Sequence, residues 1–473
     1  MVEHAVRRSP IASISQGIIG WSTLVLTLLF VLLYGGNSPA YWTLFGVVVI
    51  ALFVLQCGLT MLRGGHWTNA RLFWPALLYL GVLAWGMLQT LPSLPDAWAH
   101  PFWALVPGAE ATVSATPVSG GHGVLRLACY AMIFWIAIQA SMNAKRAQRF
   151  LVAFALWSTA LALFGLYAAI SGNNFILGEQ ANSNVSASFV NRNSYATYAA
   201  MGLATNLGLY LHLVRSNVPP SGSRGSALRG FLERFFSVAW IFLFGAVICL
   251  SALLLTASRA GVASGLVAAI VLFVMLRRDS GSSKIVWLLA AILLGAFLTV
   301  LSENVLTRLL GQTSDLRFVI YPVILEHLRD RFWLGHGFGA FHDTFRPFVP
   351  LEAASGEWDF AHSTYLENLW EMGIPAALAF YAALAWVAAV IFRGAVKRRR
   401  NRVFPVVALA CLVAGALHSL VDFSLQMPAT AAMFAFILGV GWAHAWQRGS
   451  ATDDMAKERG PAAARETSSS KPT

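Results

Sequence analysis

The chain has 473 residues, of which 57% are hydrophobic and only 11% are charged, and its mean hydropathy is +0.64. A soluble globular domain usually carries about 25% charged residues, so this composition excludes an ordinary soluble fold and predicts a polytopic membrane protein. The net charge of +12 does not indicate a nucleic-acid partner, because the basic residues gather in the short connections between apolar runs.

Twelve apolar runs approach or exceed the roughly 20 residues that a membrane-spanning helix needs. The first run is long enough to remain as a span, so no cleaved signal peptide is expected. Most of the 33 Lys and Arg residues fall in alternate connections, which predicts that both termini are cytoplasmic. The expected spans are 17–34, 40–62, 72–90, 124–142, 149–171, 194–214, 236–256, 259–277, 284–301, 363–392, 403–425 and 428–446.

The predicted fold class is therefore an all-α polytopic membrane protein with about 12 transmembrane helices and one large, partly helical outer loop. The expected organisation is a cytoplasmic N-terminus (1–16), transmembrane helices 1–9 (17–301), the outer loop (302–362), transmembrane helices 10–12 (363–446) and a disordered cytoplasmic tail (447–473).

The outer loop ends at His362, which directly precedes a predicted helix. Thr364 and Glu367 fit a capping box, so the helix is expected to start near Thr364. The run 363–392 predicts one helix about 45 Å long, about 15 Å more than the hydrocarbon core requires. His362 would then lie at or above the outer surface, where the positive end of the helix favours the neutral imidazole that a general base needs. The alternative is a structural hydrogen bond to a loop carbonyl.

Three arginines on the outer side break the positive-inside pattern. Arg259 opens a span directly after Ser258, Arg192 lies between two asparagines before another span, and Arg317 begins an amphipathic stretch of the outer loop. Guanidinium groups match phosphate oxygens in pairs and stay charged, so a diphosphate lipid is a suitable ligand for them. The alternatives are snorkelling for Arg259, interfacial anchoring for Arg192 and a solvated loop charge for Arg317.

Other polar residues near the outer side are expected to be structural. His418 and Asp422 are four residues apart and are placed on one helix face, where they could bond each other or brace a neighbouring helix. Glu367 is expected to be a helix cap and Glu371 an interfacial charge. The glycine-rich run 333–339 lacks the Lys-Ser/Thr of a phosphate loop and predicts a tight, closely packed turn. The remaining arginines of the outer loop are expected to be surface charges: Arg308, Arg329, Arg331 and Arg346.

This pattern resembles the O-antigen ligase and polymerase superfamily over about residues 180–440. His362-Ser363, followed by nine residues and then Gly373-Ile374-Pro375-Ala376, is similar to the family's His-[Asn/Ser/Gln]-x9-Gly-x-x-Gly signature, with alanine in place of the last glycine. Further motifs follow in the family's order: Asn191-Arg192-Asn193, Ser258-Arg259-Ala260-Gly261, Arg317 with Tyr321, and Leu334 to Phe341.

The resemblance implies the membrane glycosyltransferase C fold and an undecaprenyl-diphosphate-linked glycan as donor at the periplasmic face of the bacterial inner membrane. It implies an inverting reaction that needs no metal or other cofactor. By position, His362 would deprotonate the acceptor hydroxyl, and Arg192, Arg259 and Arg317 would bind the diphosphate. We place Tyr321, His418 and Asp422 in supporting roles.

Two acceptors fit this chemistry equally well. A ligase would transfer the glycan to lipid A–core, whereas an O-antigen or exopolysaccharide polymerase would transfer it to another carrier-linked glycan. A polysaccharide transporter or flippase is a third interpretation. Transporters place polar groups at mid-membrane on broken helices in matched halves, whereas the ionisable groups here gather at one face, which disfavours transport.

Overall fold

The computed structural model describes residues 10–62, 70–92, 95–174, 179–180, 184–216, 238–277, 316–356 and 358–446. The predicted span 284–301, Arg308 and the tail 447–473 lie outside these residues. Within them, the only strands are β1 (Asn173–Asn174) and β2 (Glu179–Gln180), which pair antiparallel.

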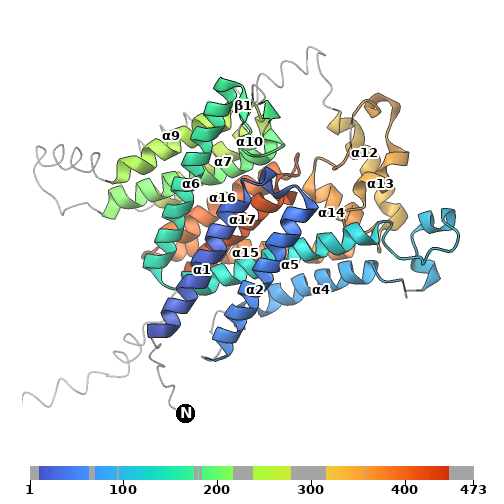
Figure 1. Cartoon of the computed structure of the whole chain (residues 1–473), viewed down its shortest axis with the longest axis horizontal. Coiled ribbons are helices and arrows are strands. Elements are labelled where there is room, and N and C mark those ends of the chain that lie inside the picture. The colour runs from blue at the N-terminus through green and yellow to red at the C-terminus, as the bar shows by residue number, and fades with distance from the viewer. Residues whose placement is uncertain are drawn as a thin grey trace, which may run out of the picture.

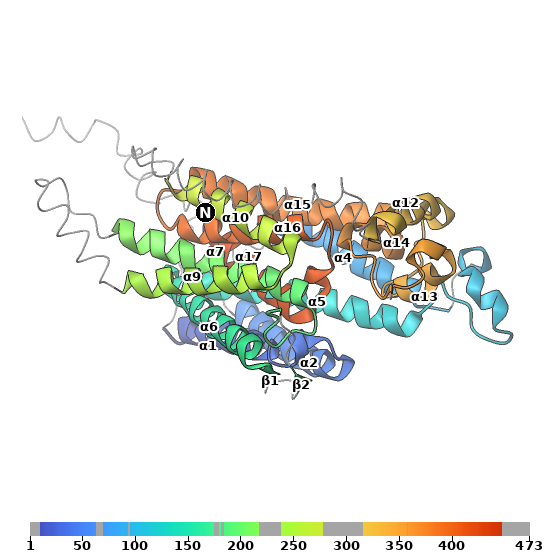
Figure 2. The same ribbon diagram turned by 90° about the horizontal axis from the view of Figure 1, so that it is seen from above.

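Long helices make up most of the structure (Figures 1 and 2). Six described helices are long and apolar enough to cross a membrane, and four more are apolar but shorter. The predicted all-helical, polytopic membrane architecture is therefore confirmed, while the total of 12 spans stays a prediction. The long helices are α1 (Pro10–Phe30), α2 (Pro39–Met61), α4 (Phe73–Gln89), α5 (Pro117–Ser141), α6 (Ala144–Ser171), α7 (Arg192–Ser216), α9 (Ala239–Leu255), α10 (Arg259–Arg277), α15 (Ile374–Lys397), α16 (Val403–His418) and α17 (Pro428–Ala445).

Helix α7 lies at the centre of the bundle, in contact with α6, α9, α10 and α16. Its buried side chains include Thr197, Thr205 and Asn206. The Asn206 amide donates to the carbonyls of Ala155 and Gly202, so these buried polar groups are paired within the protein. A helix enclosed by other helices can carry such residues because no lipid touches them.

The prediction of one helix over 363–392 is wrong. The chain forms α14 (Thr364–Met372) and then α15, with a break at Gly373, whose φ of 79° and ψ of 156° are not helical. Pro375 lies in the first turn of α15, where its missing N–H costs nothing. His362 therefore does not head a single straight helix that stands out from the membrane.

Helix α14 instead belongs to a compact unit that we call the end segment, residues 316–372. It also contains α12 (Arg317–His327) and α13 (Phe341–Phe345), and Figures 1 and 2 both place these helices at one end of the bundle. The end segment has a small apolar core of its own, built on Ile320, Ile324, Phe341, Phe345 and Trp370.

The glycine-rich turn packs against the C-terminal end of α14, as its sequence predicted. The last carbonyls of a helix have no partner within it. Here the carbonyl of Trp370 accepts from the N–H of His336 (3.0 Å), and that of Glu371 accepts from Gly337 (2.9 Å). Gly335 has a φ of +66°, and a Cβ there would collide with the backbone of Glu371. Only glycine allows this approach.

We expect Gly335→Ala to lower the midpoint of thermal unfolding by several degrees more than Gly172→Ala. Gly172 has nearly the same φ, +67°, but a Cβ there meets nothing within 4 Å. Gly172→Ala thus carries only the cost of a left-handed alanine, about 1–2 kcal/mol. Gly335→Ala adds a collision with backbone, which cannot rotate away. Thermal unfolding of the purified variants in detergent measures both, and equal midpoints would contradict the packing argument.

The prediction that Arg331 is a surface charge is wrong. Its half-buried guanidinium donates to the carbonyls of Ala99, Val113 and Gly335 (each 3.1 Å). These bonds tie the loop between α4 and α5 to the end segment. Arg329 does match its prediction, because its side chain is 76% exposed and its contact is a 3.6 Å pair with Glu326.

A buried histidine pair joins the same two parts of the chain. His100 Nε2 lies 2.9 Å from His336 Nδ1, and the His336 ring stacks on Trp370 with centroids 4.3 Å apart. Burial lowers the pKa of His100 to about 4 and that of His336 to about 3. Both rings are therefore neutral near pH 7, so one donates the shared proton and the other accepts it.

Candidate active site

The turn between α16 and α17, residues 419–427, is where the predicted site segments meet. Helix α16 ends at His418, so the prediction that His418 and Asp422 share one helix face is wrong. Asp422 lies in the turn and is fully buried. The two side chains are linked instead through the hydroxyl of Ser424, which lies 2.5 Å from Asp422 Oδ1 and 3.4 Å from His418 Nδ1.

The start of α7, where Arg192 is the first helical residue, is bound to this turn. The Asn193 amide donates to Asp422 Oδ2 (2.8 Å), and the Thr197 hydroxyl lies 2.6 Å from His418 Nδ1. His418 and Asp422 therefore brace α7, one of the two roles expected for them. Arg192 itself is exposed.

The starts of α10 and α12 approach the same turn. Gly261, two residues after the exposed Arg259, lies so close to His418 that a Cβ there would be 3.2 Å from the imidazole. Ser258 caps α10 by accepting from the N–H of Gly261 (3.3 Å). Arg317 is half-buried and donates from Nη1 to the carbonyl of Val421 (2.9 Å).

The backbone around His362 is held from both sides in an unusual conformation. His362 has a φ of +52°, which is costly for a residue with a Cβ and is often found at functional sites. Its carbonyl accepts from the Tyr321 hydroxyl (2.7 Å), and the N–H of Ala361 donates to Glu367 Oε2 (2.7 Å). The N-cap of α14 is Ser363, so the predicted Thr364–Glu367 capping box is corrected.

The half-buried imidazole of His362 contacts two aromatic rings and lines a pocket. Its centroid is 5.8 Å from that of Trp358 and 5.1 Å from that of Phe423. The His362 pocket has a volume of about 220 Å³, and Asn191 and Ser194 of the α7 start also line it. The histidine and the segment that carries Arg192 therefore share one cavity.

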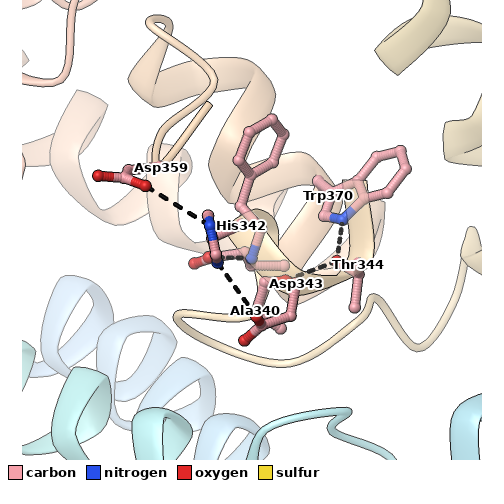
Figure 3. Close-up of polar contacts among 8 residues, drawn as sticks. Ala340, His342, Asp343, Thr344, Asp359 and Trp370 are labelled. Atoms are coloured by element: carbon pink, nitrogen blue, oxygen red, sulfur yellow. Dashed lines mark hydrogen bonds and ion pairs between the residues drawn. The ribbon is translucent and has the colours of Figure 1, made fainter. Parts of the chain in front are cut away.

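Figure 3 shows how the end segment supports this region. The Trp370 indole donates to the Thr344 hydroxyl (2.8 Å), which itself donates to the carbonyl of Ala340 (2.6 Å). Beside them His342 contacts Asp343 (3.0 Å) and, through Nε2, Asp359 (3.6 Å). Asp359 is also a wall residue of the His362 pocket, so the end segment helps to position that wall.

The prediction that Glu371 is an interfacial charge is wrong, because it is 6% exposed and accepts from the N–H of Phe341 (3.1 Å). Burial raises the pKa of Glu371 to about 7. Burial, together with the carboxyl of Glu371, raises the pKa of Glu367 well above its usual value. The positive charge of Arg126 on α5 opposes both shifts. The two glutamates thus form a buried carboxyl pair that favours bound protons.

This pair predicts a pH dependence of stability. The Glu371 carboxyl binds a proton more tightly when folded, with a pKa of about 7, than at its ordinary value of 4.5. Between these values the folded state holds more protons, so the contribution of Glu371 to stability falls as pH rises through 7. We expect the unfolding midpoint of the wild type, relative to that of Glu371→Gln, to fall by a few degrees from pH 4.5 to pH 8.

The difference between the unfolding midpoints of the two proteins cancels the titration of His100 and His336, because both histidines are present in both proteins. A constant difference across this pH range would show that Glu371 is ionised in the fold.

The structure thus brings the segments of all seven predicted site residues to one region. Arg192 and Arg317 begin helices that are bound to the α16–α17 turn, and Arg259 begins a helix that packs on His418 at the end of α16. His362 contacts the turn through Phe423. Within the described residues, no group of three or more His, Cys, Asp or Glu side chains is placed to hold a metal ion.

The sequence did not predict that Tyr34, Asn37 and Asp359 line the pocket. It also did not predict that the charge of Arg126 acts on Glu367 and Glu371. Arg126 did carry a signal, because it is a charged residue inside an otherwise apolar span. Nothing in the short α1–α2 connection marked Tyr34 or Asn37.

These features define a multi-pass helical membrane protein with a histidine pocket at one end of its bundle, next to helix starts that carry arginine. The O-antigen ligase family model matches residues 244–381, which supports the predicted resemblance to the O-antigen ligase and polymerase superfamily. The matched region includes Arg259, Arg317 and His362. A comparison with curated proteins finds no match.

Proposed function

We propose that this protein is a glycosyltransferase that moves a glycan from an undecaprenyl-diphosphate carrier to a hydroxyl group of lipid A–core. The observation that carries the proposal is the His362 pocket, in which the signature histidine shares a cavity with the α7 start headed by Arg192. The family match supports an enzyme of the ligase or polymerase type.

In this proposal His362 is the general base. It takes the proton of the acceptor hydroxyl, whose oxygen attacks the anomeric carbon while the bond to the diphosphate breaks. One displacement from the face opposite the leaving group inverts the anomeric centre. The leaving group is already an activated phosphate, so positioning and charge stabilisation can provide most of the rate enhancement without a metal.

The guanidinium groups of Arg192, Arg259 and Arg317 would bind the diphosphate and stabilise the charge that it gains on leaving. Arg192 and Arg259 are exposed and each begins a helix, so the positive end of the helix dipole adds to the side-chain charge. Tyr321 would keep the His362 backbone in place through its bond to the carbonyl.

We place the protein in the bacterial inner membrane with the end segment on the periplasmic side and both termini in the cytoplasm. The distribution of Lys and Arg between the helices supports this orientation. Twelve spans and the boundaries 1–16, 17–301, 302–362, 363–446 and 447–473 are part of the same proposal, with the correction that α14 lies on the periplasmic side and the first membrane helix of 363–446 is α15.

The alternative acceptor is a second carrier-linked glycan, which would make the protein a polymerase. A deletion strain distinguishes the two. Loss of a ligase leaves lipid A–core bare while long carrier-linked glycan accumulates, and loss of a polymerase leaves single repeats on the acceptor. A deletion that changes neither glycan would count against both.

A further inference from the structure

Part of the wall of the His362 pocket comes from outside the region that matches the family. Tyr34 and Asn37 belong to the connection between α1 and α2, and Phe423 and Met427 to the α16–α17 turn. The family match, which spans residues 244–381, contains the histidine but none of these four residues. Substrate contacts particular to this chain can therefore lie on this wall.

The α1–α2 connection has a fixed and strained shape. Tyr34 has a φ of +55°, and Gly35 and Gly36 follow with φ of +66° and +79°. A Cβ on either glycine would collide with an aromatic ring, that of Phe189 at Gly35 and that of Phe30 at Gly36. Both rings are buried, so packing holds Tyr34 in a left-handed conformation that is unfavourable for a residue with a Cβ. Such strain next to a cavity often marks a binding position.

Strained residues also gather around the rest of the site. Among the described residues, five other than glycine have a positive φ. Tyr34 and His362 line the pocket, Ala187 lies in the loop that leads to α7, and Ala257 directly precedes Ser258 and Arg259. The fifth, Asn401, lies in the connection between α15 and α16. The strain is thus concentrated at one place in the molecule.

The chemistry of the pocket differs from that of a phosphate site. No Lys or Arg is among the described residues that line it. The lining combines aromatic faces such as Tyr34 and Phe360 with the amides of Asn37 and Asn191, which can both donate and accept hydrogen bonds. Flat apolar surfaces with a few well-placed polar groups suit a ligand that has apolar faces and a rim of hydroxyls.

We propose that the His362 pocket binds one uncharged sugar ring of the glycan substrates, and that Tyr34 and Asn37 contact this ring directly. A volume of about 220 Å³ is enough for one ring. This inference rests on the proposed function, to which it adds the class of sugar and the residues that select it. The diphosphate then lies outside the pocket, near the arginines.

Asp359 gives the pocket its preference for uncharged sugars. Its side chain is 68% exposed and lines the pocket, and His342 Nε2 lies 3.6 Å from its carboxylate, a contact drawn in Figure 3. A carboxylate accepts hydrogen bonds from sugar hydroxyls but repels the carboxylate of an acidic sugar. A uronic acid should therefore bind less well than the neutral sugar of the same configuration.

A binding measurement tests the inference without requiring transfer. The probes are methyl glycosides of glucose, galactose and mannose with their matching uronic acids, each added to purified wild type and Asn37→Leu in detergent. Saturation-transfer NMR reports which probes touch the protein. Leu has the same branching and number of heavy atoms as Asn but makes no hydrogen bonds, so about tenfold weaker binding is expected. Asn173→Leu, an exposed amide away from the pocket, is the matched control.

At least one neutral glycoside should bind the wild type, more strongly than its uronic acid, and should lose affinity in Asn37→Leu but not in Asn173→Leu. Binding of no neutral glycoside, or equal binding to the wild type and Asn37→Leu, would overturn the inference and leave the proposed transfer reaction untouched.

Kinetics then assigns the sugar to one of the two substrates. Asn37→Leu should raise KM about tenfold for either acceptor or donor, with kcat and the other KM within about twofold of wild type. A higher KM for the acceptor places its sugar in the pocket, and a higher KM for the donor places the transferred sugar there. Unchanged values for both substrates in an active enzyme would overturn the inference.

Discussion

His362→Ala is expected to lower the rate of glycan transfer by about a hundredfold to ten-thousandfold, which is the usual contribution of a general base. The acceptor hydroxyl is a poor nucleophile until its proton is removed, and His362 is the one histidine that lines the pocket among the described residues. The loss should appear in kcat, because the bound substrates remain in place while the proton acceptor is missing. Transfer to a defined acceptor by purified protein measures it.

The matched control is His342→Ala. His342 lies in the same end segment and is 50% exposed, and it reaches the pocket only through Asp359. Its loss should leave kcat within a few-fold of wild type. A fully active His362→Ala enzyme would show that His362 is not the general base. Equal losses of kcat in both variants would indicate a general disturbance of the end segment.

Arg259→Ala is expected to lower transfer by about a hundredfold or more, the size of effect seen when one group that stabilises developing charge is removed. Arg259 is exposed at the start of α10, where the helix dipole also favours an anion. The transfer rate of Arg259→Lys should lie between those of Arg259→Ala and the wild type. Lysine keeps the charge but cannot form the bidentate contact with phosphate oxygens.

Arg329→Ala is the matched control, since that arginine is exposed in the end segment and pairs only with Glu326. It should be close to wild type in the same assay. If Arg259→Ala is equally active, Arg259 only snorkels to the lipid headgroups, the alternative that its sequence position left open.

Much of the helical architecture could be predicted because long apolar runs determine membrane helices locally. Expected spans such as 40–62 and 259–277 agree with α2 and α10 to within a residue. The close packing of the glycine-rich turn was also predictable, since so many glycines in seven residues rarely occur without a positive φ or a close approach.

The division of 363–392 was not predictable from periodicity. Gly373 and Pro375 are both tolerated in a membrane helix, and Pro375 lies where a new helix can begin. Helix α14 ends because of a tertiary contact. Its last carbonyls accept hydrogen bonds from the N–H groups of the glycine-rich turn, which lies more than 30 residues earlier in the chain. The family signature includes Gly373 but does not say how the chain bends there.

Burial of polar residues was likewise invisible in the sequence. The residues next to Glu371 and Arg331 in the sequence are typical of a protein surface. In the fold, however, Glu371 accepts from the N–H of Phe341, and Arg331 donates to a carbonyl of the α4–α5 loop. The α1–α2 wall of the pocket meets His362 only because α1, α2 and α17 pack together, so neither Tyr34 nor Asn37 could be linked to it by spacing.

The most direct test of the account is transfer by the purified protein in a bilayer disc, with a defined undecaprenyl-diphosphate glycan and lipid A–core or a carrier-linked glycan as acceptor. We predict that wild type forms glycan-linked lipid A–core, that a chelator does not stop the reaction, and that His362→Ala protein forms almost none. No transfer to either acceptor by a folded wild-type protein, or equal transfer by His362→Ala, would contradict the account.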